Sequence, residues 1–167
     1  MNRWPVTIEL PVQWGDMDSF QHVNNVVYLR WLESARIAYF ERAGILAGMP
    51  DVGPIQARQE IDYRLPLTYP DAVRVAATVT KLGNTSFTMG LRVYSKRGGA
   101  GSARDGQSAE ALSTGGRAIA AEGIAVIVML DYRTGRAVPL SAELRAAIEQ
   151  LEASAPDPGQ SDEPWRS

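Results

Sequence analysis

Two aspartates, a histidine and two asparagines gather in one short segment between a strand pattern and a long helix pattern. They are Asp16, Asp18, His22, Asn24 and Asn25. The first turn of a helix has unpaired backbone N–H groups and a partial positive charge. An N–H there can polarise a carbonyl and stabilise the oxyanion that forms on attack. If Asn24 caps the helix, its side chain accepts a later N–H, which leaves the Asn25 N–H free for a ligand. Asp18 could then attack the carbonyl or activate a water, chemistry suited to hydrolysis of an activated acyl group.

Other interpretations of the same residues stay open. Asp16 and Asp18 could only order a turn through hydrogen bonds to the backbone, and Asn24 could be no more than a helix cap. His22 is the one histidine of the chain and could be an ordinary loop residue. The spacing of the two aspartates is also that of a magnesium pair for phosphoryl chemistry, although the parallel α/β pattern that usually surrounds such a pair is missing.

The composition excludes most other catalytic chemistry. The chain has no Cys, so it has no thiolate nucleophile, no disulfide and no cysteine metal site. One histidine and no cysteine are too few for a zinc site. The sequence has no G-x-S-x-G elbow, no phosphate-binding loop and no dinucleotide fingerprint. Carboxylates, hydroxyls and backbone amides remain, and we expect neither a metal nor a cofactor.

Charge and hydropathy limit the partners and the location. The formal net charge is −2, whereas proteins that bind nucleic acid usually carry a basic excess. The first residues have no apolar stretch of a secretory signal. No apolar run approaches the roughly 18 residues that span a bilayer. We therefore expect a cytoplasmic domain with no nucleic-acid partner and no membrane span.

A long apolar helix is predicted over 24–43, directly after the polar segment. Its spine consists of apolar residues at helical spacing: Tyr28, Leu32, Ala35, Tyr39 and Ala43. Trp31 and other apolar residues widen this stripe, which predicts a helix almost surrounded by protein. Asn24 is a good N-cap and Gly44 a good residue to end the helix.

Alternation of apolar and polar residues predicts five strands: 6–14, 55–65, 73–82, 86–95 and 119–131. A short helix is predicted over 141–151. One long apolar helix and a mostly antiparallel sheet make an α+β domain, and a sheet wrapped around the helix would explain its apolar surface. The domain is expected to cover residues 1–152. Composition predicts a flexible insertion in a hairpin loop over 97–117 and a disordered tail over 153–167.

The segment from Trp14 to Gly44 resembles the hotdog-fold acyl-CoA thioesterases, and within them the 4-hydroxybenzoyl-CoA thioesterase-like family. The family pattern is an aromatic residue, D-x-D, H-V-N-N and a helix with Y and E-x-A-R. The matching residues here are Trp14, Asp16, Asp18, His22, Val23, Asn24, Asn25, Tyr28, Glu33, Ala35 and Arg36. A second block matches from Ile61 to Asp71, and the last strand matches from Val126 to Pro139.

The resemblance implies a hotdog fold, in which an antiparallel sheet wraps around a long central α-helix. It also implies chains paired into a homodimer or homotetramer, with active sites where chains meet. The implied reaction is hydrolysis of an acyl-CoA to a free acid and CoA, and CoA is then substrate rather than cofactor. Asp18 matches the catalytic position, as nucleophile or general base. The N–H that polarises the thioester carbonyl matches Asn25.

The remaining motif residues receive supporting roles from the resemblance. Asp16, His22 and Asn24 match positions that support the loop, whereas Tyr28 and Trp31 match core positions or the wall of the acyl pocket. Four strand cations are candidates for contacts to the CoA phosphates, although arginines on strands more often belong to a solvated face: Arg58, Arg64, Lys81 and Arg92.

Two alternatives to a thioesterase are retained. Hotdog hydratases and dehydratases of acyl thioesters carry a G-D-x-N-P-x-H motif, and no N-P precedes His22 here. A non-catalytic acyl-CoA sensor would usually carry a DNA-binding region, and no basic helix-turn-helix stretch occurs. The sequence leaves open the acyl group and the choice between CoA and acyl-carrier-protein thioesters.

Overall fold

A computed structural model describes residues 4–97 and 118–156. Its elements follow one another as β1 (Val6–Pro11), η1 (Trp14–Asp16), α1 (Asn25–Arg42), η2 (Ile45–Gly48), β2 (Val52–Tyr63), β3 (Ala72–Leu82), β4 (Ser86–Ser95), β5 (Ala118–Asp131), β6 (Arg136–Ala137) and α2 (Ala142–Ala153). The predicted order of one strand, a long helix, four strands and a short helix is confirmed. The sequence patterns missed the two short 3₁₀ turns and the two-residue strand β6.

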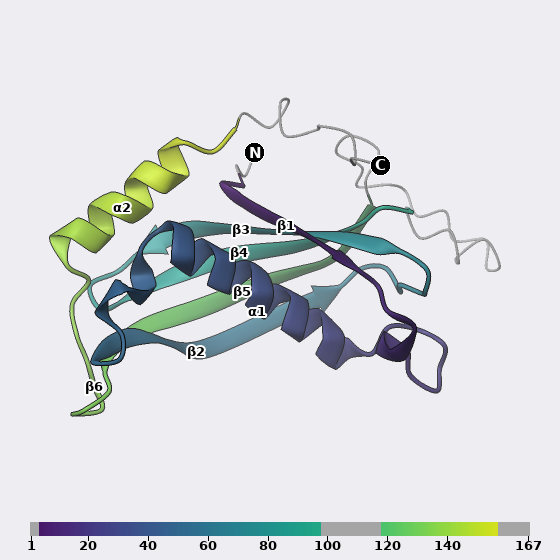
Figure 1. The fold of residues 1–167 in the computed structure, drawn as a ribbon, viewed down its shortest axis with the longest axis horizontal. Helices are drawn as coiled ribbons and strands as arrows, with labels where there is room; N and C mark the ends of the chain where they lie inside the picture. Colours follow the sequence, from purple (N-terminus) through teal and green to yellow (C-terminus); the bar gives the residue numbers. More distant parts are fainter. Residues whose placement is uncertain (1–3, 98–117, 157–167) are drawn as a thin grey trace.

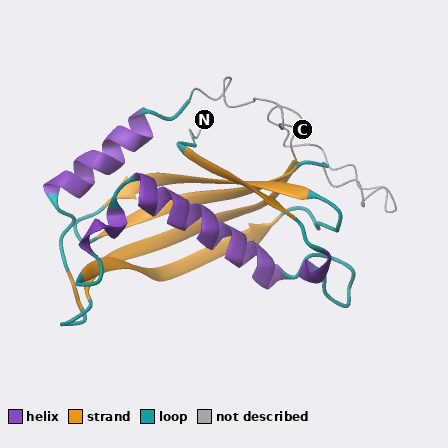
Figure 2. Cartoon of the chain, viewed as in Figure 1, coloured by secondary structure: helices purple, strands orange, loops and turns teal. Residues whose placement is uncertain are grey.

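The long strands form one antiparallel sheet in the order β1-β3-β4-β5-β2, and β6 pairs with β5. The sheet curves around α1, which lies across its concave face (Figure 1). This arrangement confirms the predicted α+β hotdog fold, with strands behind the long helix and α2 set apart at one end (Figure 2). No helix in the described ranges is long and apolar enough to cross a membrane.

The core fills the space between α1 and the sheet. Every residue of the predicted helix spine is buried. The large fully buried side chains come from α1, from the sheet and from the segment after β2: Leu32, Tyr39, Leu67, Phe87, Met89, Leu91 and Ile127. Burial of each such side chain contributes roughly 1.5–3 kcal/mol relative to an exposed position. This packing holds α1, and with it the loop that precedes α1, in a fixed place on the sheet.

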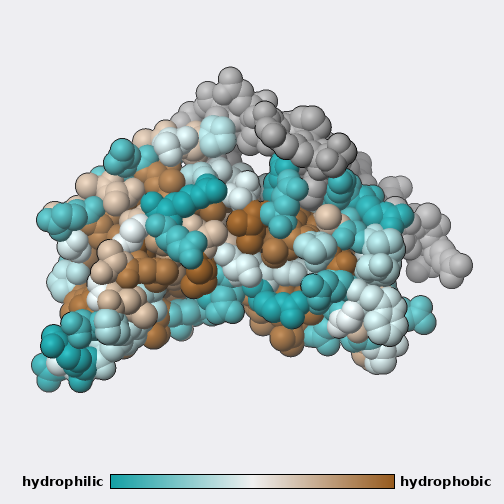
Figure 3. All heavy atoms as spheres, in the orientation of Figure 1, coloured by the Kyte–Doolittle hydropathy of each residue, from teal (hydrophilic) through white to brown (hydrophobic). Residues whose placement is uncertain are grey.

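The prediction that protein surrounds α1 almost completely is wrong for the single chain. Val26 is 63% exposed, and Leu29 and Ile37 are also exposed. The reason is geometric, because the sheet covers only one side of the helix. Figure 3 views the molecule from the α1 side and shows hydrophobic residues at the surface there, interspersed with polar ones.

The edge strand β2 differs in its bounds from the prediction over 55–65. It starts at Val52 and stops at Tyr63. The N–H groups of both Arg64 and Leu65 donate to the Ala120 carbonyl, so the backbone leaves the regular ladder at this point. The chain then turns toward α1.

The described chain also corrects the predicted domain end. α2 runs to Ala153, and Ala155 is buried, so ordered structure continues beyond residue 152. Residues 98–117 and 157–167, which hold nearly all of the predicted insertion and most of the predicted tail, lie outside the described residues.

Candidate active site

The polar loop before α1 is folded tightly on itself. Met17 and Val23 form an isolated antiparallel bridge. The Asp18 N–H donates to the His22 carbonyl at 2.9 Å, and the Gln21 N–H donates to the Asp18 carbonyl at 3.0 Å. These two hydrogen bonds therefore fix the backbone of Asp18, from which its side chain projects.

Asp18 keeps part of its carboxylate available. Oδ1 accepts the Phe20 N–H at 2.8 Å, an Asx-type contact. Nothing in the described part of the chain donates to Oδ2. The side chain is only partly buried, so Oδ2 can reach a substrate or a water. The turn-ordering interpretation and the catalytic interpretation of Asp18 are therefore compatible.

Asp16 is different, because both of its carboxylate oxygens are occupied. It is 5% exposed. Oδ2 accepts the Gln13 N–H at 2.8 Å, and Oδ1 accepts from Arg30 Nη2 at 2.6 Å. The Asp16 carbonyl also accepts the Asn24 N–H at 2.9 Å. These contacts join the loop to α1 and engage both oxygens of the Asp16 carboxylate.

The N-terminus of α1 has the geometry expected from its sequence. Asn24 has extended backbone angles, and its Oδ1 accepts the Val26 N–H at 2.9 Å. Asn25 is the first helical residue, and its N–H has no acceptor within the described residues. This N–H and the positive end of the helix dipole are therefore available to an oxygen of a ligand.

A pocket of about 360 Å³ joins the loop, the start of α1 and the end of β2. Its walls are formed by residues from all three segments: Asp18, His22, Val23, Asn25, Tyr28, Tyr63, Arg64, Leu65 and Pro66. The Val23 N–H donates to the Leu67 carbonyl at 2.8 Å, which fastens the loop to the segment after β2. Asp18 and Asn25 therefore line the same cavity.

Two tyrosines form one wall of this pocket. Their rings meet edge to face with centroids 5.2 Å apart, Tyr28 donates to the Leu65 carbonyl at 3.2 Å, and Tyr63 donates to the Asn25 carbonyl at 3.4 Å. Burial raises the pKa of Tyr28 to about 12. Tyr28 is therefore a neutral phenol near pH 7 and serves as wall rather than base.

The remaining predicted site residues fall into two groups. His22 and Tyr28 line the pocket, and Asn24 lies directly beside it as the cap. Trp31 does not line this pocket; its side chain is buried and packs against Tyr28 with ring centroids 5.3 Å apart.

The sequence reasoning missed the pocket wall that β2 supplies. The sequence patterns place Tyr63 and Leu65 in a strand and Pro66 directly after it, and assign none of them to the site. The sequence feature that points to this wall is the block from Ile61 to Asp71, which matches the family pattern. The match does not show that the block lies beside the loop that carries Asp18.

Comparisons with known proteins identify similar chains. The model of the thioesterase-like superfamily matches residues 12–148. The long-chain acyl-CoA thioesterase FadM of Escherichia coli is 24% identical over 145 residues, which cover 86% of this chain and 96% of FadM. A thioesterase of Thermus thermophilus, solved with coenzyme A and Zn, is 31% identical with a TM-score of 0.71, over 92% of this chain and 98% of that one. The PA2801 protein of Pseudomonas aeruginosa is also 31% identical, with a TM-score of 0.69, over 87% of this chain and 99% of that one.

Proposed function

The chain belongs to the thioesterase-like superfamily, and we propose that it hydrolyses an acyl-CoA to a free acid and CoA with Asp18 as the catalytic carboxylate. The observation that carries this proposal is that Asp18 and Asn25 line one pocket, while within the described residues Asp18 Oδ2 has no donor and the Asn25 N–H has no acceptor. Thioester hydrolysis needs these two groups, a carboxylate at the carbonyl carbon and a donor at the carbonyl oxygen.

The proposed reaction begins with the thioester oxygen accepting the Asn25 N–H. Asp18 Oδ2 then either attacks the carbonyl carbon to give a mixed anhydride that water cleaves, or takes a proton from the water that attacks. In both routes the tetrahedral oxyanion lies at the positive end of α1, the C–S bond breaks, and CoA leaves as a thiolate that is protonated by solvent. The Phe20 N–H bond to Oδ1 fixes the carboxylate and leaves Oδ2 toward the substrate.

CoA is the proposed carrier of the acyl group because of the named relatives. FadM is a long-chain acyl-CoA thioesterase, and the Thermus protein was solved with coenzyme A. The pocket of the single chain is open to solvent and therefore does not define the size of the acyl group. The assay identifies the acyl group by comparing several acyl-CoAs.

We further propose that two chains pair along β2 into a homodimer, the smaller of the two assemblies expected from the sequence. β2 is a 12-residue edge strand, and on its outer side no described strand pairs with it. Long unpaired edges are usually covered in stable proteins. Antiparallel pairing of two copies about a twofold axis would cover it and give a closed assembly. The exposed apolar residues on the outer face of α1 support burial against a second chain.

The test is thiol release from short, long and aromatic acyl-CoAs by the wild type, Asp18→Asn and Asn25→Ala. Asp18→Asn keeps an oxygen for the Phe20 N–H, so the turn should persist while activity falls by about 10²–10⁴. Asn25→Ala should change activity far less, because the backbone N–H remains. Near-wild-type activity of Asp18→Asn would remove Asp18 from its role. Acyl-CoA binding without release by the wild type would favour the non-catalytic binder.

A further inference from the structure

A second pocket, here called the α2 pocket, lies at the end of α1 away from the pocket that holds Asp18. It has a volume of about 390 Å³ and lies between the end of α1, η2, the start of β2, the end of β5 and the start of α2 (Figure 1). Only Ser141 and Glu143 among its lining residues have polar side chains. The larger apolar lining residues are Ile45, Val52, Met129 and Leu144. This size and this lining are typical of a site for an apolar ligand.

Both polar residues of the α2 pocket are engaged at the start of α2. The Ser141 hydroxyl accepts the Leu144 N–H at 3.1 Å as the helix cap. Hydrogen bonds from the Glu143 N–H and from Ser141 lower the pKa of the exposed Glu143 carboxyl, so this group is ionised near pH 7. The described residues that line the pocket include no Lys or Arg. The negative charge at the rim disfavours an anionic ligand, and the lining suits a neutral hydrocarbon tail.

The α2 pocket and the Asp18 pocket lie at opposite ends of β2, on the same face of the sheet. Tyr63, the last residue of β2, lines the Asp18 pocket and packs against Tyr28 on α1. Val52, the first residue of β2, lines the α2 pocket and lies two positions from the residue that pairs with Met129. Met129 is part of the core under α1. Because side chains alternate along a strand, Val52 and Tyr63 both face the α1 side.

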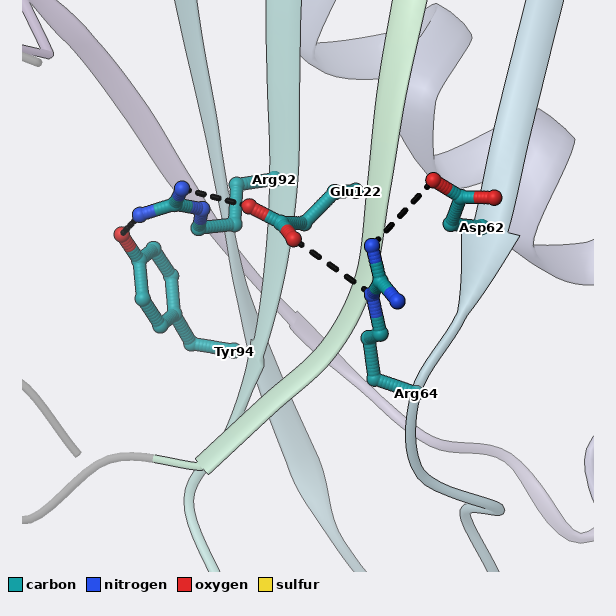
Figure 4. A network of polar contacts seen from close by, with 5 residues as sticks. All are labelled: Asp62, Arg64, Arg92, Tyr94 and Glu122. Atoms are coloured by element: carbon teal, nitrogen blue, oxygen red, sulfur yellow. Dashed lines mark hydrogen bonds and ion pairs between the residues drawn. The ribbon is translucent and has the colours of Figure 1, made fainter. Parts of the chain in front are cut away.

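The other face of the sheet is charged at the end of β2. Arg64 contacts Asp62 and Glu122, and Glu122 also pairs with Arg92 (Figure 4). A hydrocarbon tail laid over these groups would displace their water without replacing its hydrogen bonds. A tail that starts at Asp18 therefore belongs on the α1 face.

Within one chain the core separates the two pockets. α1 has 18 residues and is therefore about 27 Å long. Between its ends the side chains of Leu32, Ala35 and Tyr39 are fully buried in the core. Because protein interiors are close-packed, a tail that starts at Asp18 has no path through this region to the α2 pocket of its own chain.

Pairing of two chains along β2, as proposed above, brings the two kinds of pocket together. In an antiparallel pair about a twofold axis, the end of one β2 lies beside the start of the other when the axis passes near the middle of the strand. Such an axis also pairs the largest number of edge residues. Neighbouring strands are about 4.8 Å apart. The Asp18 pocket of each chain then adjoins the α2 pocket of the other chain, on the α1 side of the joined sheet.

We propose that the α2 pocket of one chain binds the hydrocarbon tail of the acyl group whose thioester is cleaved by Asp18 of the other chain. The substrates are then acyl-CoAs with a long aliphatic tail rather than a short or aromatic acyl group. This inference rests on the proposed thioesterase function and on the β2 dimer.

The first experiment fills the α2 pocket. Ala147 lines it and is half-buried, whereas Ala146 is exposed and does not line it. Ala147→Phe should lower kcat/KM on dodecanoyl-CoA about tenfold and leave kcat/KM on butanoyl-CoA unchanged. The control Ala146→Phe should match the wild type on both. Ala47→Phe, which fills the pocket from an exposed position in η2, is the second variant in case Ala147→Phe does not fold. Equal losses on both substrates, or no loss on dodecanoyl-CoA, would overturn the proposal.

Mixed dimers determine which chain supplies the α2 pocket. One chain carries Asp18→Asn and the other Ala147→Phe, each with its own affinity tag. The proposal leaves one intact site, so dodecanoyl-CoA should be cleaved at about half the wild-type rate. With both changes in one chain and a wild-type partner, the intact Asp18 adjoins the filled pocket, so only cleavage of butanoyl-CoA should persist at that level. The reverse pattern would place the tail within one chain, and a monomeric protein would lack the composite site; either result would overturn the proposal.

A binding measurement separates this inference from the proposed activity. S-dodecyl-CoA is a thioether that water does not cleave, and S-methyl-CoA is its short counterpart. Ala147→Phe should weaken the Kd for S-dodecyl-CoA about tenfold and leave the Kd for S-methyl-CoA unchanged, even if no thioester is cleaved. Equal affinities of the wild type and Ala147→Phe for S-dodecyl-CoA would refute the role of the α2 pocket.

Discussion

Replacing Asp16 tests how the loop that carries Asp18 is held. The Asp16 carboxylate is 5% exposed and accepts two charge-assisted hydrogen bonds, from the Gln13 N–H and from Arg30. A hydrogen bond to a charged group contributes about 1.5–3 kcal/mol. Arg30 is 59% exposed, so its ion pair is reduced to the surface value of less than about 1 kcal/mol. We therefore expect Asp16→Ala to lower the free energy of unfolding by about 2 kcal/mol, and Arg30→Ala by less than about 1 kcal/mol.

The same replacement should reduce turnover, because a displacement of about 1 Å of a catalytic group can cost 10²-fold in rate. Urea denaturation gives the stabilities, and thiol release gives kcat and KM. Asp16→Ala should lower kcat with a smaller change in KM, and Asp16→Asn, which keeps one acceptor oxygen, should recover part of both losses. Unchanged stability and unchanged kcat in Asp16→Ala would refute the idea that Asp16 positions the loop. A loss of binding equal to the loss of turnover would instead place Asp16 in contact with the substrate.

The remaining predictions concern stability. Glu152 on α2 accepts hydrogen bonds from the hydroxyls of Tyr39 and Thr78 and from the Val79 N–H. Glu152→Ala should therefore lower the free energy of unfolding by about 3 kcal/mol, whereas the control Glu149→Ala, exposed on the same helix, should change the urea midpoint little. Burial raises the pKa of Tyr28 to about 12 from 10.0. Stability should thus be independent of Tyr28 ionisation below pH 10 and fall above it, where the unfolded chain ionises first. Tyr28→Phe should show a shallower loss of stability than the wild type between pH 10 and 12; an equally steep loss would contradict this.

The start of α1 could be predicted because its determinants are local. Asn24 caps the helix through the N–H two residues later, and the free N–H of Asn25 follows from its place as the first helical residue. The apolar spine follows from the helical period alone. None of these features needs knowledge of which strands are neighbours, so sequence reasoning placed the helix and its reactive end within a residue of their observed positions.

The second half of the pocket depends on contacts between residues far apart in the chain. Tyr63 donates to the Asn25 carbonyl across 38 positions, and the path that brings it there is set by the register of β2 on β5. Alternation identifies a strand but not its neighbour, so Tyr63 could not be assigned to the site. The exposed face of α1 was misjudged for a similar reason. Apolar residues on a helix do not say whether the chain's own sheet or another molecule covers them.

The two aspartates show most clearly what spacing leaves undecided. Both belong to the D-x-D motif, and both suit a turn, a metal pair or catalysis by residue type alone. Their donors distinguish them: Arg30, fourteen positions away on α1, and the Gln13 N–H donate to the Asp16 carboxylate, whereas within the described residues the Asp18 carboxylate accepts only from the Phe20 N–H. A buried carboxylate with both oxygens hydrogen-bonded is held in place by its partners. The half-buried Asp18 carboxylate, whose Oδ2 has no donor within the described residues, lines the same pocket as Asn25 and is the one that we propose acts on a thioester.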